Sequence, residues 1–224
     1  MNIERTKAII LRRVNYGESD RILTLLTPNG QREAIARGVR REKSKLAGGI
    51  ELFAVSDIVL RSGRGDLGIL TSARLESFFG NILNNYERLQ FGYEVTKLVR
   101  NASYGIDESE WYRVLRQTYE GLNSSSLPLN LIQTWFYIRF AELNGYALNL
   151  KSDTNGNELS RDELYRYDLS EKGLKLSEEG NITSEHIKLL RIIANKDLEI
   201  ISKIGGIDKV LFDCWSLSRQ HADI

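Results

Sequence analysis

Short apolar runs and alternating segments rich in β-branched residues recur through the first 75 residues, a pattern that is typical of β-strands. Five segments follow this pattern and are separated by residues that favour turns: 8–11, 22–27, 33–36, 53–61 and 67–75. Pro28-Asn29-Gly30 predicts a tight turn because proline presets φ and Asn-Gly tolerates positive φ, and a further turn is expected at 62–66. Five short strands in so few residues predict a small barrel such as the OB-fold, although an SH3-like barrel would give nearly the same pattern.

From about residue 77 the apolar period changes to 3.6, which predicts helices. Three apolar stripes support this prediction. The first is Tyr86, Leu89, Tyr93, Thr96 and Arg100, broadened by Val95, Leu98 and Val99. The second is Trp111, Val114, Leu115, Thr118, Tyr119 and Leu122, and the third is Ile132, Trp135, Phe136, Phe140 and Leu143. Ser109 stands where the second helix would be capped, and the third is expected to end at Asn144-Gly145. Thr183 or Ser184 would cap a closing helix, and residues 209–218 would form a last short one.

These periods together predict an α+β chain of two domains. We expect an OB-type five-stranded β-barrel over residues 1–78 and an α-helical bundle domain over 79–224. Residues 150–180 are polar and glycine-bearing, which predicts a loop-rich insertion in the helical domain.

The charge of the chain is divided unevenly between these regions. Residues 1–75 carry 14 Lys/Arg against 8 Asp/Glu, and residues 76–224 carry 17 against 22, so a net charge of +1 conceals a basic first third. A basic barrel followed by an acidic remainder indicates that the barrel meets a polyanion.

The basic charge is concentrated after the third expected strand. The candidate nucleic-acid-binding residues here are Arg37, Arg40, Arg41, Lys43 and Lys45, and Arg12, Arg13 and Arg21 would join them if the first two strands are adjacent. An isolated basic run is more often a solvated loop, but on an OB barrel we favour contact with phosphates. Only Tyr16 and Phe53 are aromatic in this region, so phosphate contact should outweigh base stacking, and duplex substrates are as plausible as single strands.

Residues that could carry catalysis or bind a metal are few. His186 and His221 have no carboxylate or cysteine at ligand spacing, and His221 is expected in a frayed tail. Cys214 is the only cysteine, which excludes an internal disulfide and a cysteine-based zinc site, and its apolar neighbours predict a buried, inert thiol. We therefore expect no catalytic residue, no cofactor and no metal. With no apolar run of roughly 20 residues and no signal-peptide pattern, we expect no membrane association and a place in the bacterial cytoplasm.

Several sequence motifs in the first 100 residues are weak signals one by one but are specific when they occur together. They are Tyr16-Gly17-Glu18-Ser19-Asp20-Arg21-Ile22-Leu23, then Ala36-Arg37-Gly38-Val39-Arg40-Arg41-Glu42-Lys43-Ser44, then Gly65-Asp66-Leu67 and Ala73-Arg74-Leu75-Glu76. In these motifs the chain resembles the RecO family of DNA repair and recombination mediators. Within the first motif, Ser19 and Asp20 are expected to fix the turn by hydrogen bonds to backbone amides.

The resemblance implies an OB-fold followed by a helical domain. It also implies binding of single- and double-stranded DNA, annealing of complementary strands, and cooperation with RecR to load RecA onto DNA covered by single-stranded-DNA-binding protein. Some family members hold the tail of that protein on their helical domain. Two other readings stay open: a protein-interaction scaffold whose basic loop only steers encounter, and an OB protein that binds RNA.

The chain departs from the family at a zinc module. Many members carry four cysteines after the third helix, opening with Cys-x-x-Cys-Gly. Here Ser152-Asp153-Thr154-Asn155-Gly156 occupies that place, and the second cysteine pair, expected near 173–178, is also missing. We therefore expect a metal-free insertion whose loops are held by hydrogen bonds and packing.

Overall fold

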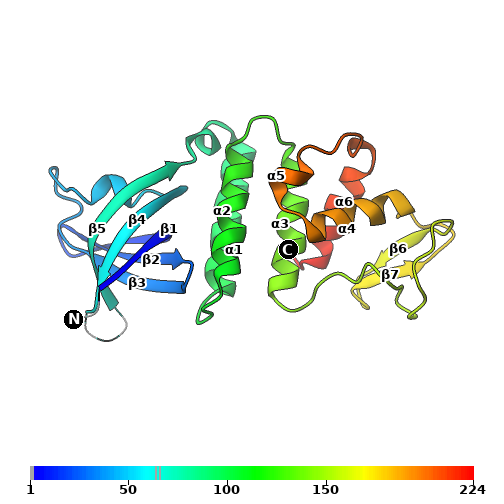
Figure 1. The fold of residues 1–224 in the computed structure, drawn as a ribbon, viewed down its shortest axis with the longest axis horizontal. Helices are drawn as coiled ribbons and strands as arrows, with labels where there is room; N and C mark the ends of the chain where they lie inside the picture. The colour runs from blue at the N-terminus through cyan, green and yellow to red at the C-terminus, as the bar shows by residue number, and fades with distance from the viewer. Residues whose placement is uncertain (1–2, 64, 66) are drawn as a thin grey trace. The chain divides into compact units, whose positions relative to one another are not determined.

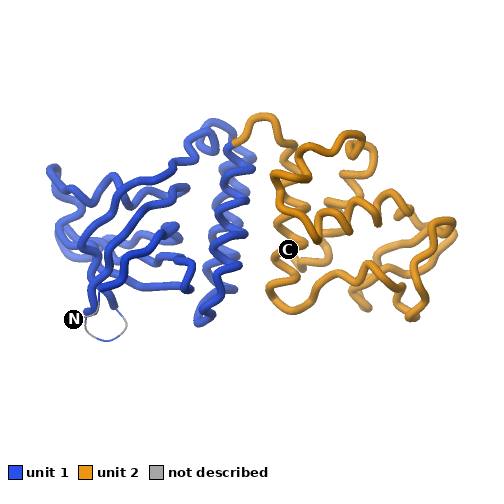
Figure 2. The backbone as a smooth tube through the Cα atoms, in the orientation of Figure 1, with its two compact units in different colours: residues 1–123 blue, residues 124–224 orange. Residues whose placement is uncertain are grey.

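The computed structural model describes residues 3–63, 65 and 67–224. Contacts divide the chain into two compact units, Met1–Asn123 and Ser124–Ile224 (Figure 2). The first unit contains the barrel together with two helices. The domain boundary expected at residues 78/79 was placed where strands give way to helices, whereas the two units are defined by contacts. The expected boundary therefore stays a prediction.

Five strands close into a barrel in the first unit (Figure 1). They are β1 (Ile3–Tyr16), β2 (Asp20–Thr27), β3 (Gly30–Ala36), β4 (Ala54–Arg61) and β5 (Leu67–Phe78). The strand order is β1-β2-β3-β5-β4, and the pairing of β3 with β5 is parallel whereas all other pairs are antiparallel. The expected OB-like barrel followed by helices is confirmed. The turn expected at 62–66 falls partly on residues 64 and 66, which lie outside the described residues.

A bend in β1 allows the sheet to close. The first half of β1 pairs with β4 and the second half with β2, and the register shifts between Ile10 and Arg12. Such an irregularity bends a strand and increases its twist. Alternate residues of the five strands point inward and, with Val39 and Ile50 from the segment between β3 and β4, form the barrel core: Ala8, Ile10, Leu23, Leu25, Ala34, Ala36, Val39, Ile50, Ile58, Leu60 and Leu70.

A short 3-10 helix, η1 (Ala47–Gly49), packs on β5. A Cβ atom at Gly49 would lie 2.4 Å from the carbonyl oxygen of Ala73, so only glycine allows this close approach of two backbones. Ile50, directly after the helix, is fully buried in the barrel core. The segment that follows the basic stretch is thus fixed to the barrel.

Two helices pack beside the barrel in the same unit: α1 (Tyr86–Ala102), preceded by η2 (Gly80–Asn84), and α2 (Ser109–Asn123). All six residues of the stripe expected for α2 are buried. The stripe expected for α1 was partly wrong. Val95, Thr96 and Val99 are buried as expected, but Tyr86 and Tyr93 are exposed, and Phe91 and Gly92 are buried in their place. The packing partner explains the difference: the ring of Phe53 lies against Gly92, where a Cβ would come within 2.9 Å of it.

Phe53 joins the barrel to these helices. Its φ of 55° is unusual for an aromatic residue, and its ring makes edge contacts with Tyr93 and Tyr119 at centroid distances of 5.1 and 5.4 Å. Gln31 adds polar contacts by donating to the carbonyl oxygen of Arg100 at 2.6 Å and to Ser103 Oγ at 2.7 Å. The two helices of this unit thereby pack against one side of the barrel.

The second unit is helical with one small hairpin. Its elements are α3 (Leu129–Leu143), β6 (Tyr165–Asp168), β7 (Gly173–Leu176), α4 (Ser184–Asn195), α5 (Leu198–Ile201) and α6 (Asp208–His221). α3 ends at Asn144-Gly145 as expected, with Gly145 at a φ of 85°. Thr183 is the N-cap of α4 and forms a reciprocal capping box with His186. The last helix is longer than the 209–218 expected for it.

The start of the insertion is built around Asp153, a buried residue in the segment 152–156. Its Oδ1 accepts hydrogen bonds from the amides of Asn155 and Asn157 at 2.9 and 2.8 Å, and Thr154 N donates to Leu174 O of β7 at 2.8 Å. These bonds to the carboxylate lower the pKa of Asp153. Among residues 3–63, 65 and 67–224, no three His, Cys, Asp or Glu side chains lie close enough to hold a metal ion.

Candidate nucleic-acid interface

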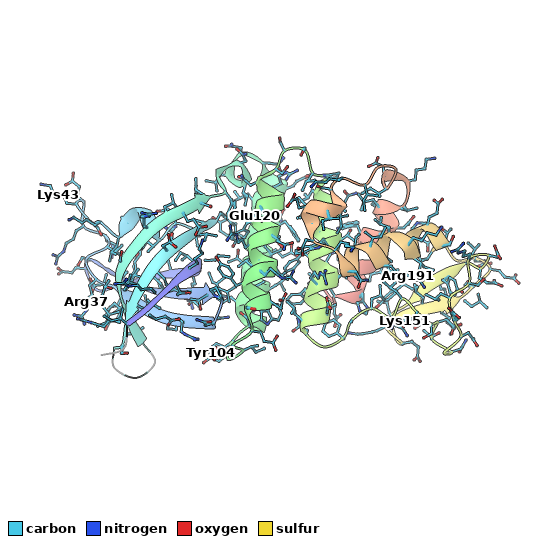
Figure 3. All side chains as sticks on the ribbon, in the orientation of Figure 1. Arg37, Lys43, Tyr104, Glu120, Lys151 and Arg191 are labelled. Atoms are coloured by element: carbon cyan, nitrogen blue, oxygen red, sulfur yellow. The ribbon has the colours of Figure 1, made fainter. Side chains whose placement is uncertain are left out.

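The basic loop, which we define as residues 37–45, follows β3 at the open end of the barrel. All five of its predicted cations, Arg37, Arg40, Arg41, Lys43 and Lys45, are exposed. In Figure 3, Arg37 and Lys43 lie on the side of the barrel away from α1 and α2. Val39 is only 3% exposed and belongs to the barrel core, so one apolar side chain anchors the loop between its cations.

The turn between β1 and β2 holds the basic loop. Asp20 Oδ1 accepts a hydrogen bond from Gly38 N at 2.7 Å, and Arg40 N donates to Ser19 O at 2.9 Å. Ser19 Oγ in turn donates to Asp20 Oδ1 at 3.3 Å. Gly38 has a φ of 63°, which favours glycine. The first two of the motifs that carried the resemblance are therefore in contact, and Asp20 bonds to an amide of the basic loop as well as within its own turn.

The cations of the basic loop differ in what they contact. Arg40 Nη1 donates to Gly17 O at 3.3 Å, which links this side chain to the β1–β2 turn. Within the described part of the chain, Arg37, Arg41, Lys43 and Lys45 make no side-chain hydrogen bond or ion pair. Their charge is thus available to an external anion, since no protein carboxylate neutralises it.

The second group of candidates divides into free and engaged residues. β1 and β2 are adjacent, with Arg12 opposite Thr24 and Arg13 opposite Leu23, which meets the condition set for this group. Arg12 is exposed. Arg13, however, forms a salt bridge to Glu51 at 2.9 Å and bonds to Ile50 O at 3.2 Å, so it also fixes the backbone that follows the basic loop.

The third residue of that group, Arg21, donates from Nε to Asn15 Oδ1 at 3.2 Å across the β1–β2 hairpin. Of the two aromatic residues expected near the site, Tyr16 is 55% exposed at the end of β1. Phe53 is buried against the helices and cannot stack on a base. The interface therefore offers cations and little stacking surface, which suits contact with a phosphate backbone.

Two exposed cations outside the predicted set, Arg5 on β1 and Arg74 on β5, lie on the two strands that flank β4. Isolated cations give no local cluster in a sequence. The alternation of β1 and β5 predicts only that both side chains point outward, and the pairing of each strand with β4 brings them together.

The histidines and the cysteine have structural roles in the second unit. The frayed tail expected at His221 was wrong: this side chain is 2% exposed, and its Nε2 lies 2.8 Å from Tyr146 O and its Nδ1 2.9 Å from Tyr167 Oη. His186 does have a carboxylate nearby, Asp213 at 3.4 Å, which the sequence spacing did not show. Burial raises the pKa of the Cys214 thiol to about 12, so this thiol is inert at neutral pH.

The family model for the N-terminal region of recombination protein O matches residues 1–79, the whole of the barrel. The chain belongs to the RecO family. Two curated relatives are named DNA repair protein RecO. The one from Roseiflexus sp. is 36% identical over 66% of this chain and 52% of the relative. The one from Alkaliphilus metalliredigens is 28% identical over 89% of this chain and 84% of the relative. A third, from Dehalococcoides mccartyi, is 33% identical over 67% of this chain.

The alignments with the Roseiflexus and Dehalococcoides relatives span only 52% and 60% of those proteins. Membership in a family of DNA repair and recombination proteins, as these RecO names describe them, agrees with the expectation that the chain is not an enzyme. Within the described residues, no helix of the RecO chain combines the length and the apolar composition needed to cross a bilayer.

Proposed function

We propose that this RecO-family chain is a DNA-binding recombination mediator that uses the basic loop to contact the phosphate backbone. One observation carries the proposal: five exposed cations project from a loop that is bonded to the β1–β2 turn of an OB-like barrel. A fixed loop presents its charges together, so little ordering entropy is lost when an anion binds.

The same geometry supports binding of both single- and double-stranded DNA. Phosphate contacts depend on the spacing of charges and not on base identity, and the site lacks the row of aromatic side chains that would select unpaired bases. Bringing two strands to one protein would also accelerate annealing of complementary strands.

The partners in this proposal come from the family. We propose that the protein acts with RecR and with single-stranded-DNA-binding protein, and that it helps to load RecA onto DNA, in the bacterial cytoplasm in association with the nucleoid. The support is the family membership together with the basic loop.

The test is a fluorescence titration of the purified protein with a labelled oligonucleotide at several salt concentrations, followed by an annealing assay. We compare the wild type with Arg40→Ala plus Lys43→Ala. Each phosphate contact contributes a salt slope of about 0.7 for single strands, which is roughly fivefold in affinity at 0.1 M salt. The double variant should therefore bind about 25-fold more weakly, for all sequences alike, with a slope reduced by about 1.4.

The matched control is Arg161→Ala plus Arg166→Ala, which removes two exposed cations from the second unit. The control should bind as the wild type does. Unchanged affinity and slope in the basic-loop variant, or an equal loss in the control, would contradict the assignment of the loop. Tighter binding of RNA in direct competition would favour the RNA-binding reading, and absence of DNA binding at low salt the scaffold reading.

A further inference from the structure

A shallow groove crosses the outer face of the barrel on β1, β4 and β5. It has a volume of about 590 Å³ and is lined by Arg5, Thr6, Lys7, Asp57, Ile58, Val59, Ser72 and Arg74. We call it the β4 groove. It lies entirely within the first unit.

Strand pairing brings these residues together from distant parts of the sequence. Arg5 lies opposite Val59, and Val59 opposite Ser72, in one row across the three strands. In the next row, Lys7 lies opposite Asp57, which in turn lies opposite Arg74. Side chains of paired residues point to the same face of a sheet, so the rows place cations on both sides of β4.

The β4 groove carries an excess of positive charge. Three of its lining residues are cations and one, Asp57, is an acid. Lys7 forms an ion pair with Glu76, while Arg5 and Arg74 are exposed and make no ion pair or side-chain hydrogen bond in the part of the chain described here. The hydroxyl of Ser72, also exposed, adds a hydrogen-bond donor beside them.

The β4 groove faces away from the strands that hold the basic loop. In the closed order β1-β2-β3-β5-β4, β4 has β1 and β5 as neighbours and lies across the ring from β2 and β3. The basic loop follows β3 and is bonded to Asp20 at the start of β2. Outward side chains of opposite strands in a small barrel point in opposite directions. One strand lying on the basic loop therefore leaves the β4 groove open.

We propose that the β4 groove binds the sugar-phosphate backbone of a second nucleic-acid strand while the basic loop holds the first. This inference rests on the proposed function and deepens it. Two strands held on one barrel are at high effective concentration relative to each other, which is what annealing requires. Charge complementarity identifies the occupant, because the exposed cations suit phosphates. Ile58 is buried in the core, so among the described residues that line the groove Val59 is the one apolar side chain that a ligand would meet.

The experiment counts strands on the full chain. Native mass spectrometry is run on the protein with two non-complementary oligonucleotides of different mass, and the rate of annealing of complementary strands is measured in parallel. The test variant is Arg5→Thr plus Arg74→Thr, because threonine favours strands and keeps the barrel intact. Arg5→Lys plus Arg74→Lys keeps the charge, and Arg161→Thr plus Arg166→Thr is the matched control.

We expect complexes of one protein with two strands for the wild type, the lysine variant and the control. The Arg5→Thr, Arg74→Thr variant should keep its affinity for the first strand and bind the second about 25-fold more weakly at 0.1 M salt, by the loss of two phosphate contacts. Its annealing rate should fall in parallel.

Three outcomes would overturn the inference. Wild-type binding of two strands by the Arg5→Thr, Arg74→Thr variant, while the basic-loop variant loses the first strand, refutes the second site and leaves the proposed function standing. If the basic-loop variant and the Arg5→Thr, Arg74→Thr variant bind the first strand equally weakly, the basic loop and the β4 groove form one continuous binding site for a single strand. Tighter binding of a short polyglutamate peptide than of the oligonucleotide, abolished by Arg5→Thr plus Arg74→Thr, assigns the β4 groove to an acidic protein partner.

Discussion

The bond between Asp20 and Gly38 predicts that DNA affinity depends on a residue that need not touch DNA. We take Asp20→Ala as the perturbation. It removes the acceptor of the 2.7 Å bond that holds the basic loop and leaves every cation of the loop in place. The expected result is weaker DNA binding with an unchanged salt slope, since the number of phosphate contacts stays the same.

The magnitude follows from the geometry of this bond. A hydrogen bond to a charged group contributes about 1.5–3 kcal/mol, and because Asp20 is partly exposed, water replaces some of it and the lower end applies. If about 1.5 kcal/mol of loop anchoring is lost, the ordered loop is populated up to roughly tenfold less. The apparent affinity falls by the same factor, because only the ordered loop presents its cations together.

The assay is the salt-dependent oligonucleotide titration, with Asp20→Asn as the matched control. Asparagine removes the same negative charge but keeps an acceptor oxygen for Gly38 N, so Asp20→Asn should bind DNA as well as the wild type or slightly more tightly. Equal affinities for Asp20→Ala and Asp20→Asn would refute the anchoring role. A reduced salt slope in Asp20→Ala would show that the loop lost contacts and not merely order.

Two further predictions concern the second unit. Burial lowers the pKa of His221 below its ordinary 6.5, so near that pH the unfolded chain takes up a proton more readily than the folded chain does. The free energy of unfolding should therefore fall as the pH drops from 7 towards 5. Urea titrations of His221→Gln should lack this decline. Elemental analysis of the purified protein should find no stoichiometric zinc. Asp153→Ala should lower the melting temperature because three hydrogen bonds to its carboxylate are lost. Addition of a chelator should leave the melting temperature of the wild type unchanged. Stoichiometric zinc, or a pH profile of His221→Gln identical to that of the wild type, would contradict these expectations.

The sequence by itself predicted the five barrel strands, the long helices and the main candidate site, whereas it predicted a loop-rich insertion where the β6–β7 hairpin lies. Short apolar runs and one clearly alternating segment marked all five strands, although β1 extends well beyond the expected 8–11, and Pro28-Asn29-Gly30 marked the β2–β3 turn, because these signals are local. The basic loop was equally visible, since its five cations lie within nine residues of one another. The six buried positions of α2 could also be predicted, because its apolar stripe is unbroken.

The tertiary structure decided what depends on packing and on strand pairing. Which face of α1 is buried follows from the ring of Phe53 against Gly92, a contact between residues 39 positions apart that no local period encodes. The hydrogen bond of Asp20 to the basic loop and the burial of His221 also depend on contacts between residues that are far apart in the sequence. The β4 groove is the clearest case: Arg5 and Arg74 are separated by 69 residues in the sequence, and only the pairing of both strands with β4 brings their charges onto one face. Local order follows from local periodicity, whereas surface electrostatics depend on which strands become neighbours.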